Sequence, residues 1–134
     1  CGGDLLFADA ALRRGMRLEL YLAEIEADFL NRSVTFADPD HFWERLFMTV
    51  KHAPLTKALI MPDALGPKPE QDSVHDRCNR WMLYTALASE WSKLELLALW
   101  DGAPGVARGG TGQMVQLIGQ KTGRRPLIID PKTL

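Results

Sequence analysis

A chain of 134 residues with 46% hydrophobic and 25% charged side chains has the length and composition of one globular domain. Its formal net charge is −1 and its basic residues are spread out, which argues against a nucleic-acid partner. No apolar run approaches the roughly 20 residues that span a bilayer. Two cysteines are too few for a disulfide scaffold or a structural zinc site. We therefore expect one cytoplasmic domain over residues 1–134, with reduced thiols and no metal.

The first half of the chain predicts helices that alternate with two strands. From Asp4 onwards the apolar residues have helical spacing, and Gly15 suits the position that ends a helix. Asp38 followed by Pro39 is typical of a helix start, with Asp38 as the N-cap. The expected elements are a helix over 4–14, a strand over 17–22, a short helix over 24–33, a helix from 38 to about 52 that buries Phe42, Leu46, Phe47 and Val50, and a strand over 55–61.

The second half continues the alternation after a proline-rich loop over 62–71. The segment 93–100 is almost continuously apolar, as in a parallel strand that is buried on both faces. The alternation predicts an α/β fold with parallel strands and crossover helices. The expected elements are a helix over 72–91 with a stripe of Val74, Cys78, Met82 and Thr85 that Trp81, Tyr84, Leu87 and Trp91 widen, the strand over 93–100, a glycine-rich loop over 101–112, a helix over 111–121 that Gly123 ends, and a strand over 126–130.

The chain begins with a glycine pair that leads into a predicted helix. Gly2 and Gly3 would let a backbone approach a ligand, and the helix N-terminus suits a phosphate. Asp4 would repel a phosphate, but it could cap the helix or accept a ribose hydroxyl. A plain turn with a helix cap is the alternative. Because such a loop should follow a strand, we expect that an N-terminal part is missing.

A second glycine-rich segment joins the buried strand to the next helix. Arg108 could neutralise a phosphate there, and Thr111 could cap the helix or donate to an oxygen. The spacing fits neither the dinucleotide fingerprint nor a P-loop, and a flexible connector is the alternative. The candidate ligand residues in this segment are Asp101, Gly102, Arg108, Gly109, Gly110, Thr111 and Gly112.

A third set of candidates lies on the long predicted helix. Asp76, Asn79 and Arg80 share a face at spacings i, i+3 and i+4. The N-terminal half of this helix could approach the carboxyl ends of the strands, where parallel sheets bind ligands. A solvated polar face is the alternative. Trp100 ends the central strand and could stack on a base, although core packing is the simpler interpretation. The three histidines are far apart in sequence and fit surface or capping positions.

Four segments of the sequence together form a recognisable pattern: Cys1-Gly2-Gly3-Asp4-Leu5-Leu6-Phe7-Ala8, Arg80-Trp81-Met82-Leu83, Leu99-Trp100-Asp101-Gly102 and Gly109-Gly110-Thr111. This pattern resembles the SLOG superfamily, which unites the LOG phosphoribohydrolases with DprA-type proteins. More narrowly, the chain is similar to bacterial modules attached to signalling proteins that carry nucleotide-cyclase domains or helical repeats. The resemblance covers nearly the whole chain.

This resemblance implies a Rossmann-like three-layer parallel sheet with helices on both faces, which lacks one or two strands before the first glycine pair. It also implies a ligand of the nucleotide class and an attached effector or cyclase domain in the longer chain. The enzymes of the group carry Pro-Gly-Gly-x-Gly-Thr-x-x-Glu and an upstream helix arginine, which Arg80 matches. Gly109, Gly110 and Gly112 match the glycines approximately, and Arg108 replaces the proline.

Gln116 falls where the resemblance places the catalytic glutamate. A glutamine cannot act as a general base, so the sequence favours a sensor that binds its ligand. One alternative is a hydrolase of nucleoside monophosphates in which Asp4, Asp101 or Glu90 supplies the carboxylate. Another is an interaction domain without a ligand. Unpaired strand edges would also make the fragment self-associate.

Overall fold

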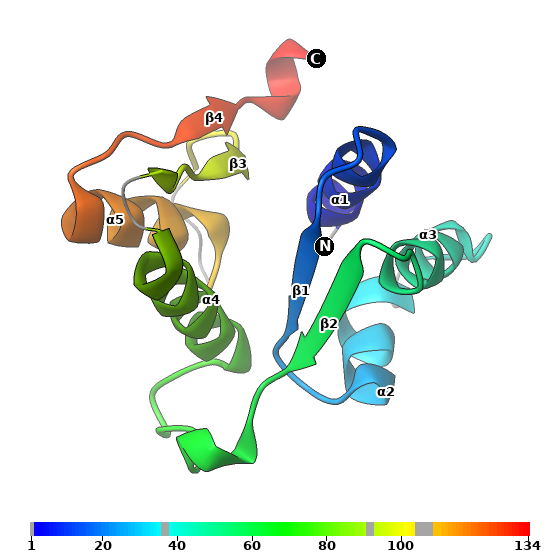
Figure 1. Ribbon diagram of the computed structural model, residues 1–134, viewed down its shortest axis with the longest axis horizontal. Helices are drawn as coiled ribbons and strands as arrows, with labels where there is room; N and C mark the ends of the chain where they lie inside the picture. Colours follow the sequence, from blue (N-terminus) through cyan, green and yellow to red (C-terminus); the bar gives the residue numbers. More distant parts are fainter. Residues whose placement is uncertain (1, 36–37, 91–92, 104–108) are drawn as a thin grey trace. The chain divides into compact units, whose positions relative to one another are not determined.

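The structure, a computed structural model, describes residues 2–35, 38–90, 93–103 and 109–134 (Figure 1). Helices and short strands alternate along the chain, so the predicted α/β class is confirmed. The described part holds no helix with the length and apolar character that a membrane crossing requires. The elements are α1 (Gly2–Arg13), β1 (Leu18–Leu22), α2 (Glu26–Phe29) with a following π-helical turn (Leu30–Val34), α3 (Phe42–Lys51), β2 (Thr56–Ile60), α4 (Val74–Glu90), β3 (Leu97–Leu99), α5 (Thr111–Thr122) and β4 (Leu127–Ile129), with 3-10 turns at Asp63–Leu65 and Pro131–Thr133.

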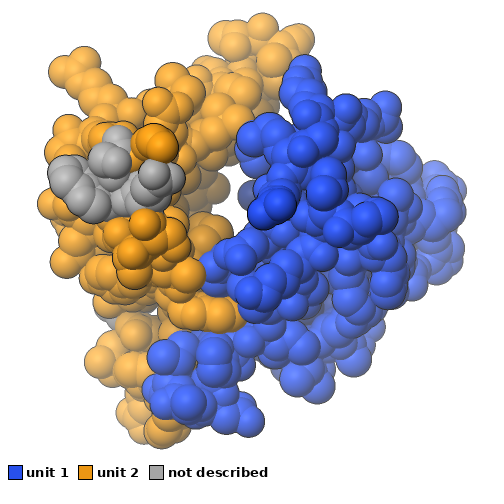
Figure 2. All heavy atoms as spheres, in the orientation of Figure 1, with its two compact units in different colours: residues 1–65 blue, residues 66–134 orange. Residues whose placement is uncertain are grey.

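The chain divides into two compact units, residues 1–65 and 66–134, which are coloured separately in Figure 2. Each unit contains one pair of parallel strands, and in each pair the second strand follows the first through helical segments. The predicted parallel pairing is therefore confirmed within each unit. Among the described residues the strands form two separate two-stranded sheets.

In the first unit, helices cover one face of the β1–β2 pair (Figure 1). The strands run in parallel register from Leu18 opposite Thr56 to Leu22 opposite Ile60. Alternate residues of a strand share one face. On the covered face, Leu22 packs with apolar side chains of α1, the π-helical turn and α3. The buried centre of this cluster consists of Leu5, Leu22, Val34 and Phe47.

In the second unit, α4 and α5 pack together beside the β3–β4 pair (Figure 1). Leu83, Met114 and Ile118 form the buried centre, and Ala98 of β3 is only 5% exposed. The opposite face is open, so the predicted burial of this strand on both faces is wrong for the chain as described. The side chains on that face are between 38% and 58% exposed, and they are Leu97, Leu99, Leu127 and Ile129.

The predicted core needs correction at three positions, two that are exposed and one that was left out. Phe42 is 49% exposed because it is the first residue of α3, where its ring meets Trp43 edge-on at 5.0 Å. Tyr84 is 48% exposed, and Lys121 lies over its ring at 5.7 Å. Leu83, which the apolar stripe did not include, is instead the most buried apolar side chain among the described residues of α4. Trp91 lies outside the described residues.

Candidate functional site

The loop from β3 to α5 ends in a glycine that is fixed to the first turn of α4. Gly109 has φ +90°, and a Cβ there would lie 2.5 Å from the backbone nitrogen of Asp76 and 2.7 Å from Ser73 Oγ. The Asn79 side chain donates to the Gly109 carbonyl at 2.9 Å, and Gln113 Oε1 accepts the Gly109 N–H. These contacts bring the N-terminal ends of α4 and α5 together, and we call this place the α4–α5 junction.

An ion pair between Asp76 and Arg80 lies beside the junction. Asp76 is 2% exposed, and Ser73 Oγ caps its backbone N–H at 2.9 Å. Arg80 donates to the two carboxylate oxygens through Nε at 3.3 Å and Nη2 at 3.1 Å. This side-chain hydrogen bonding raises the Arg80 pKa. The Arg80 side chain remains 48% exposed, so the guanidinium can also reach a ligand.

The N-terminus of α5 carries no side-chain cap within the described residues. Gly110 is the N-cap residue, with φ −79° and ψ 170°, and its carbonyl accepts the N–H groups of Gln113 and Met114. Thr111 is the first helical residue and is exposed, so the prediction that its hydroxyl caps the helix is wrong. The N–H groups of Thr111 and Gly112 precede the first hydrogen-bonded turn and suit an anion.

Trp100 is held against this helix end. A Cβ on Gly112 would lie 3.3 Å from the Trp100 ring, so the glycine lets the indole approach α5 closely. The indole Nε1 donates to the Ala103 carbonyl at 2.9 Å, which fixes the ring plane. The carboxyl end of β3 and the first turn of α5 are therefore in contact.

Asp101 follows Trp100 and is already engaged. Its Oδ1 accepts the Ala103 N–H at 3.0 Å around Gly102, whose φ is +78°, and its Oδ2 lies 3.3 Å from Lys132 Nζ. The Ala103 N–H, followed by the hydrogen bond from Lys132, lowers the Asp101 pKa. Sequence reasoning missed Lys132, although its place three residues after the last strand puts it near the carboxyl edge of the sheet.

A shallow pocket of about 200 Å³ lies between α4 and α5. Arg80 reaches it from α4, and the other lining residues follow one stripe of α5. Gln116, the predicted replacement for a catalytic glutamate, is exposed in this pocket. Leu117 and Gln120 were missed, although the i, i+4 and i+7 spacing from Gln113 places them on the same face.

The predicted glycine pair at the N-terminus belongs to the first unit. Gly2 and Gly3 form the first turn of α1, so the expectation of a loop before the helix is wrong. A Cβ on Gly2 would lie 3.1 Å from the Trp43 ring, which gives this glycine a packing role. Asp4 is exposed in the same turn. Arg108 lies outside the described residues.

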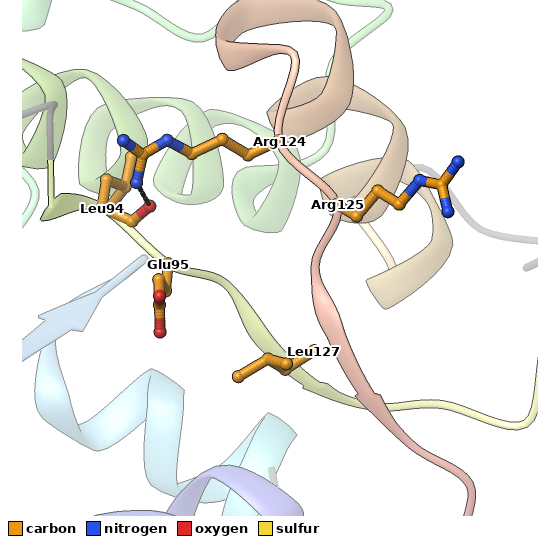
Figure 3. Close-up of a pocket in the computed structure, with 5 residues that line it drawn as sticks. All are labelled: Leu94, Glu95, Arg124, Arg125 and Leu127. Atoms are coloured by element: carbon orange, nitrogen blue, oxygen red, sulfur yellow. Dashed lines mark hydrogen bonds between the residues drawn. The ribbon is translucent and has the colours of Figure 1, made fainter.

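A second pocket, of about 320 Å³, lies at the amino ends of β3 and β4 (Figure 3). Arg124 donates to the Leu94 carbonyl at 2.9 Å, and Figure 3 shows the Arg125 side chain extending in another direction. Glu95 also lines the pocket. The two guanidinium groups do not converge, so this pocket is a weaker anion site than the α4–α5 junction.

No protein-family model matches the chain, and neither a curated protein nor a solved structure matches it. In the part of the chain that the structure describes, no three His, Cys, Asp or Glu side chains gather as metal ligands would. A function for this chain therefore rests on its own residues.

Proposed function

We propose that this chain is the cytoplasmic nucleotide-binding module of a bacterial signalling protein, with the phosphate of its ligand at the α4–α5 junction. The observation that carries the proposal is the clamped Gly109, which brings two helix N-termini beside the Arg80 guanidinium. Helix N-termini offer N–H donors and a partial positive charge to a phosphate. The resemblance of the sequence to the SLOG superfamily supports the same ligand class.

The neighbouring pocket suits the uncharged part of such a ligand. Gln116 and Gln120 offer amide groups that donate and accept hydrogen bonds, as a nucleobase edge requires. Leu117 adds an apolar surface. The negative charge of Asp76 offsets the positive charge of Arg80. Arg80 would therefore bind an anion mainly through hydrogen bonds from its guanidinium N–H groups rather than through net charge. A mononucleotide or a derivative with one exposed phosphate fits this arrangement better than a polyanion does.

The carboxylates near the site are already buried or paired, which favours binding of the ligand without hydrolysis. Cleavage of an N-glycosidic bond needs a carboxylate that is available to the substrate. Asp76 is buried against Arg80, Asp101 is paired with Lys132, and Gln116 replaces the expected glutamate. We therefore infer a sensor whose ligand changes an attached effector or cyclase domain, and the phosphoribohydrolase is the alternative.

We also propose that both strand pairs belong to one Rossmann-like three-layer sheet in the intact protein. Each pair is parallel, and the second strand of each follows the first through helical segments. Parallel sheets are normally covered on both faces, whereas the β3–β4 pair has one open apolar face. In a larger sheet with at least one further strand, a second layer of helices would cover this face.

Calorimetric titration of the intact protein with AMP, cyclic AMP and ADP-ribose tests the proposed ligand class. We expect binding of at least one of these, and a loss of about tenfold in affinity in Arg80→Gln, because a charge-assisted hydrogen bond is removed. Arg13→Gln is the matched control, since Arg13 also pairs with an aspartate four residues earlier. Equal effects of the two substitutions, or no binding of any nucleotide, would remove the junction as the site.

Chromatography of the same mixtures separates the sensor from the hydrolase. A sensor leaves AMP intact. Release of free adenine that disappears in Asp101→Asn would overturn the sensor interpretation and assign Asp101 a catalytic role.

A further inference from the structure

The carboxyl ends of β3 and β4 are joined by an ion pair that the proposed phosphate site does not use. Asp101 comes two residues after β3, and Lys132 comes three residues after β4. The Asp101 Oδ2 atom lies 3.3 Å from Lys132 Nζ. In parallel sheets, ligands bind beyond the carboxyl ends of the strands. The pair therefore lies at the edge where a ligand would sit.

Side-chain contacts connect this ion pair to the first turn of α5. Trp100, the neighbour of Asp101, packs its ring against Gly112. Both Trp100 and Asp101 are fixed through Ala103, which accepts from the indole and donates to the carboxylate. The ammonium group of Lys132 thus belongs to the same edge of the second unit as the N–H groups of Thr111 and Gly112 in the first turn of α5.

Lys132 has a fixed backbone and an exposed tip. Its backbone N–H donates to the Asp130 carboxylate at 2.9 Å, which anchors the start of the side chain. The side chain itself is 70% exposed, whereas Asp101 is held by a backbone donor. An ammonium group on a flexible stem can exchange one anionic partner for another, whereas the anchored carboxylate stays in place.

We propose that Lys132 is a further phosphate-binding residue of the nucleotide site and that Asp101 is the internal counter-ion with which the ligand competes. This inference rests on the proposed function, because the phosphate at the N-terminus of α5 is the anion that draws Lys132 away. A phosphate carries more charge than one carboxylate and presents several acceptor oxygens, so it wins the exchange at sufficient concentration. Without a ligand, Asp101 keeps the ammonium group at the edge of the site.

Calorimetric titration of the intact protein with AMP, pyrophosphate and adenosine tests the exchange. Lys132→Gln should lower the affinity for AMP and pyrophosphate about tenfold. The affinity for adenosine, which has no phosphate, should stay unchanged. Asp101→Asn should raise the affinity for AMP several-fold, because the carboxylate that competes for Lys132 is gone. In the double variant the tightening should vanish, since Asp101 acts only through Lys132. Lys132→Arg should retain most of the affinity.

Lys57 and Glu19 provide the matched control. They form an exposed ion pair at 3.8 Å within the β1–β2 sheet, and the Lys57 side chain is 69% exposed, close to the value for Lys132. Lys57→Gln and Glu19→Gln should leave AMP binding unchanged, and melting curves of all variants exclude unfolding.

The outcomes separate this inference from the proposed function. Unchanged AMP affinity in Lys132→Gln overturns the role of Lys132 and leaves the junction as the site. Weaker AMP binding in Asp101→Asn overturns the counter-ion role, because Asp101 would then contact the ligand directly. If the wild type binds none of AMP, cyclic AMP, ADP-ribose and pyrophosphate, both proposals are overturned.

Discussion

At the scale of single residues, Gly109 is the position with the least freedom to vary. It combines φ +90° with a backbone nitrogen only 2.5 Å from where a Cβ would stand. A left-handed residue with a side chain costs about 1–2 kcal/mol, and a side chain forced into packed atoms adds a further ~1–3 kcal/mol. We expect Gly109→Ala to lower the free energy of unfolding by about 3 kcal/mol, as measured by urea denaturation.

Gly123→Ala is the control for this prediction. Gly123 also has a positive φ, +69°, but no atom lies within 4 Å of its would-be Cβ. Its substitution should therefore show only the conformational cost, about 1–2 kcal/mol. Equal losses in the two variants would mean that the contact of Gly109 with α4 does not constrain the loop.

The Asp76–Arg80 pair gives a second prediction at the residue scale. Arg80→Gln leaves the buried Asp76 carboxylate without its charged partner, which is unfavourable. Because half of the Arg80 side chain is exposed to solvent, which screens the charge, we expect a loss of only about 1–2 kcal/mol in unfolding free energy. The double variant Asp76→Asn, Arg80→Gln should be more stable than Arg80→Gln alone. A less stable double variant would show that Asp76 stabilises α4 independently of Arg80.

At the scale of elements, Asp38 stabilises the start of α3 from outside the helix. The N-cap residue is His41, with φ +53°, so the prediction that Asp38 is the N-cap is wrong. Asp38 Oδ2 nevertheless accepts the Glu44 N–H at 2.9 Å. Burial alone would raise the Asp38 pKa, but hydrogen bonds from the N–H groups of residues 42–44 outweigh it and lower the pKa.

This lowered pKa predicts an acid-sensitive helix. Its contribution to stability is fully present above the unfolded-state pKa of about 3.9 and is lost as the pH falls through the lower folded-state pKa. The melting temperature of the wild type should therefore fall more steeply below about pH 4 than that of Asp38→Asn. Asp40→Asn, two residues away, should keep the wild-type slope. Parallel curves for wild type and Asp38→Asn would show that the carboxylate does not act as a charged cap.

The elements themselves were largely predictable, because apolar periodicity and glycine stops are local signals. The helix over 111–121 and its stop at Gly123 match α5, which ends at Thr122 with Gly123 in the left-handed conformation. Strand lengths were overestimated: the apolar segment 93–100 yields only Leu97–Leu99 as a strand. An apolar run predicts burial, but the length of a strand depends on which neighbour pairs with it.

The candidate site was predictable only in part, for the same reason. The shared helix face of Asp76, Asn79 and Arg80 follows from spacing alone, and all three side chains lie near the α4–α5 junction. The bond from Asn79 to Gly109 spans 30 residues, however, and no local pattern specifies it. Lys132 was missed because its partner Asp101 lies on another strand end.

At the scale of the whole molecule, the open face of the β3–β4 pair predicts self-association of residues 1–134. Five large aliphatic side chains stand at least 38% exposed on one short sheet, four of them on its open face, and contiguous apolar surface of this kind favours association. The unpaired strand edges add backbone groups that can pair with another chain. We expect the sedimentation coefficient of this chain to rise with protein concentration.

Leu127→Lys should suppress this association, because Leu127 lies on the open face and is 58% exposed, so a lysine there can reach solvent without disturbing the core. Leu134→Lys is the matched control: Leu134 is 87% exposed and lies beyond the strands. Leu134→Lys should therefore associate as the wild type does. A sedimentation coefficient that stays constant with concentration for the wild type, or falls equally in both variants, would mean that the open face does not drive association. Suppression by Leu127→Lys alone would instead identify this face as the surface through which copies of the chain associate.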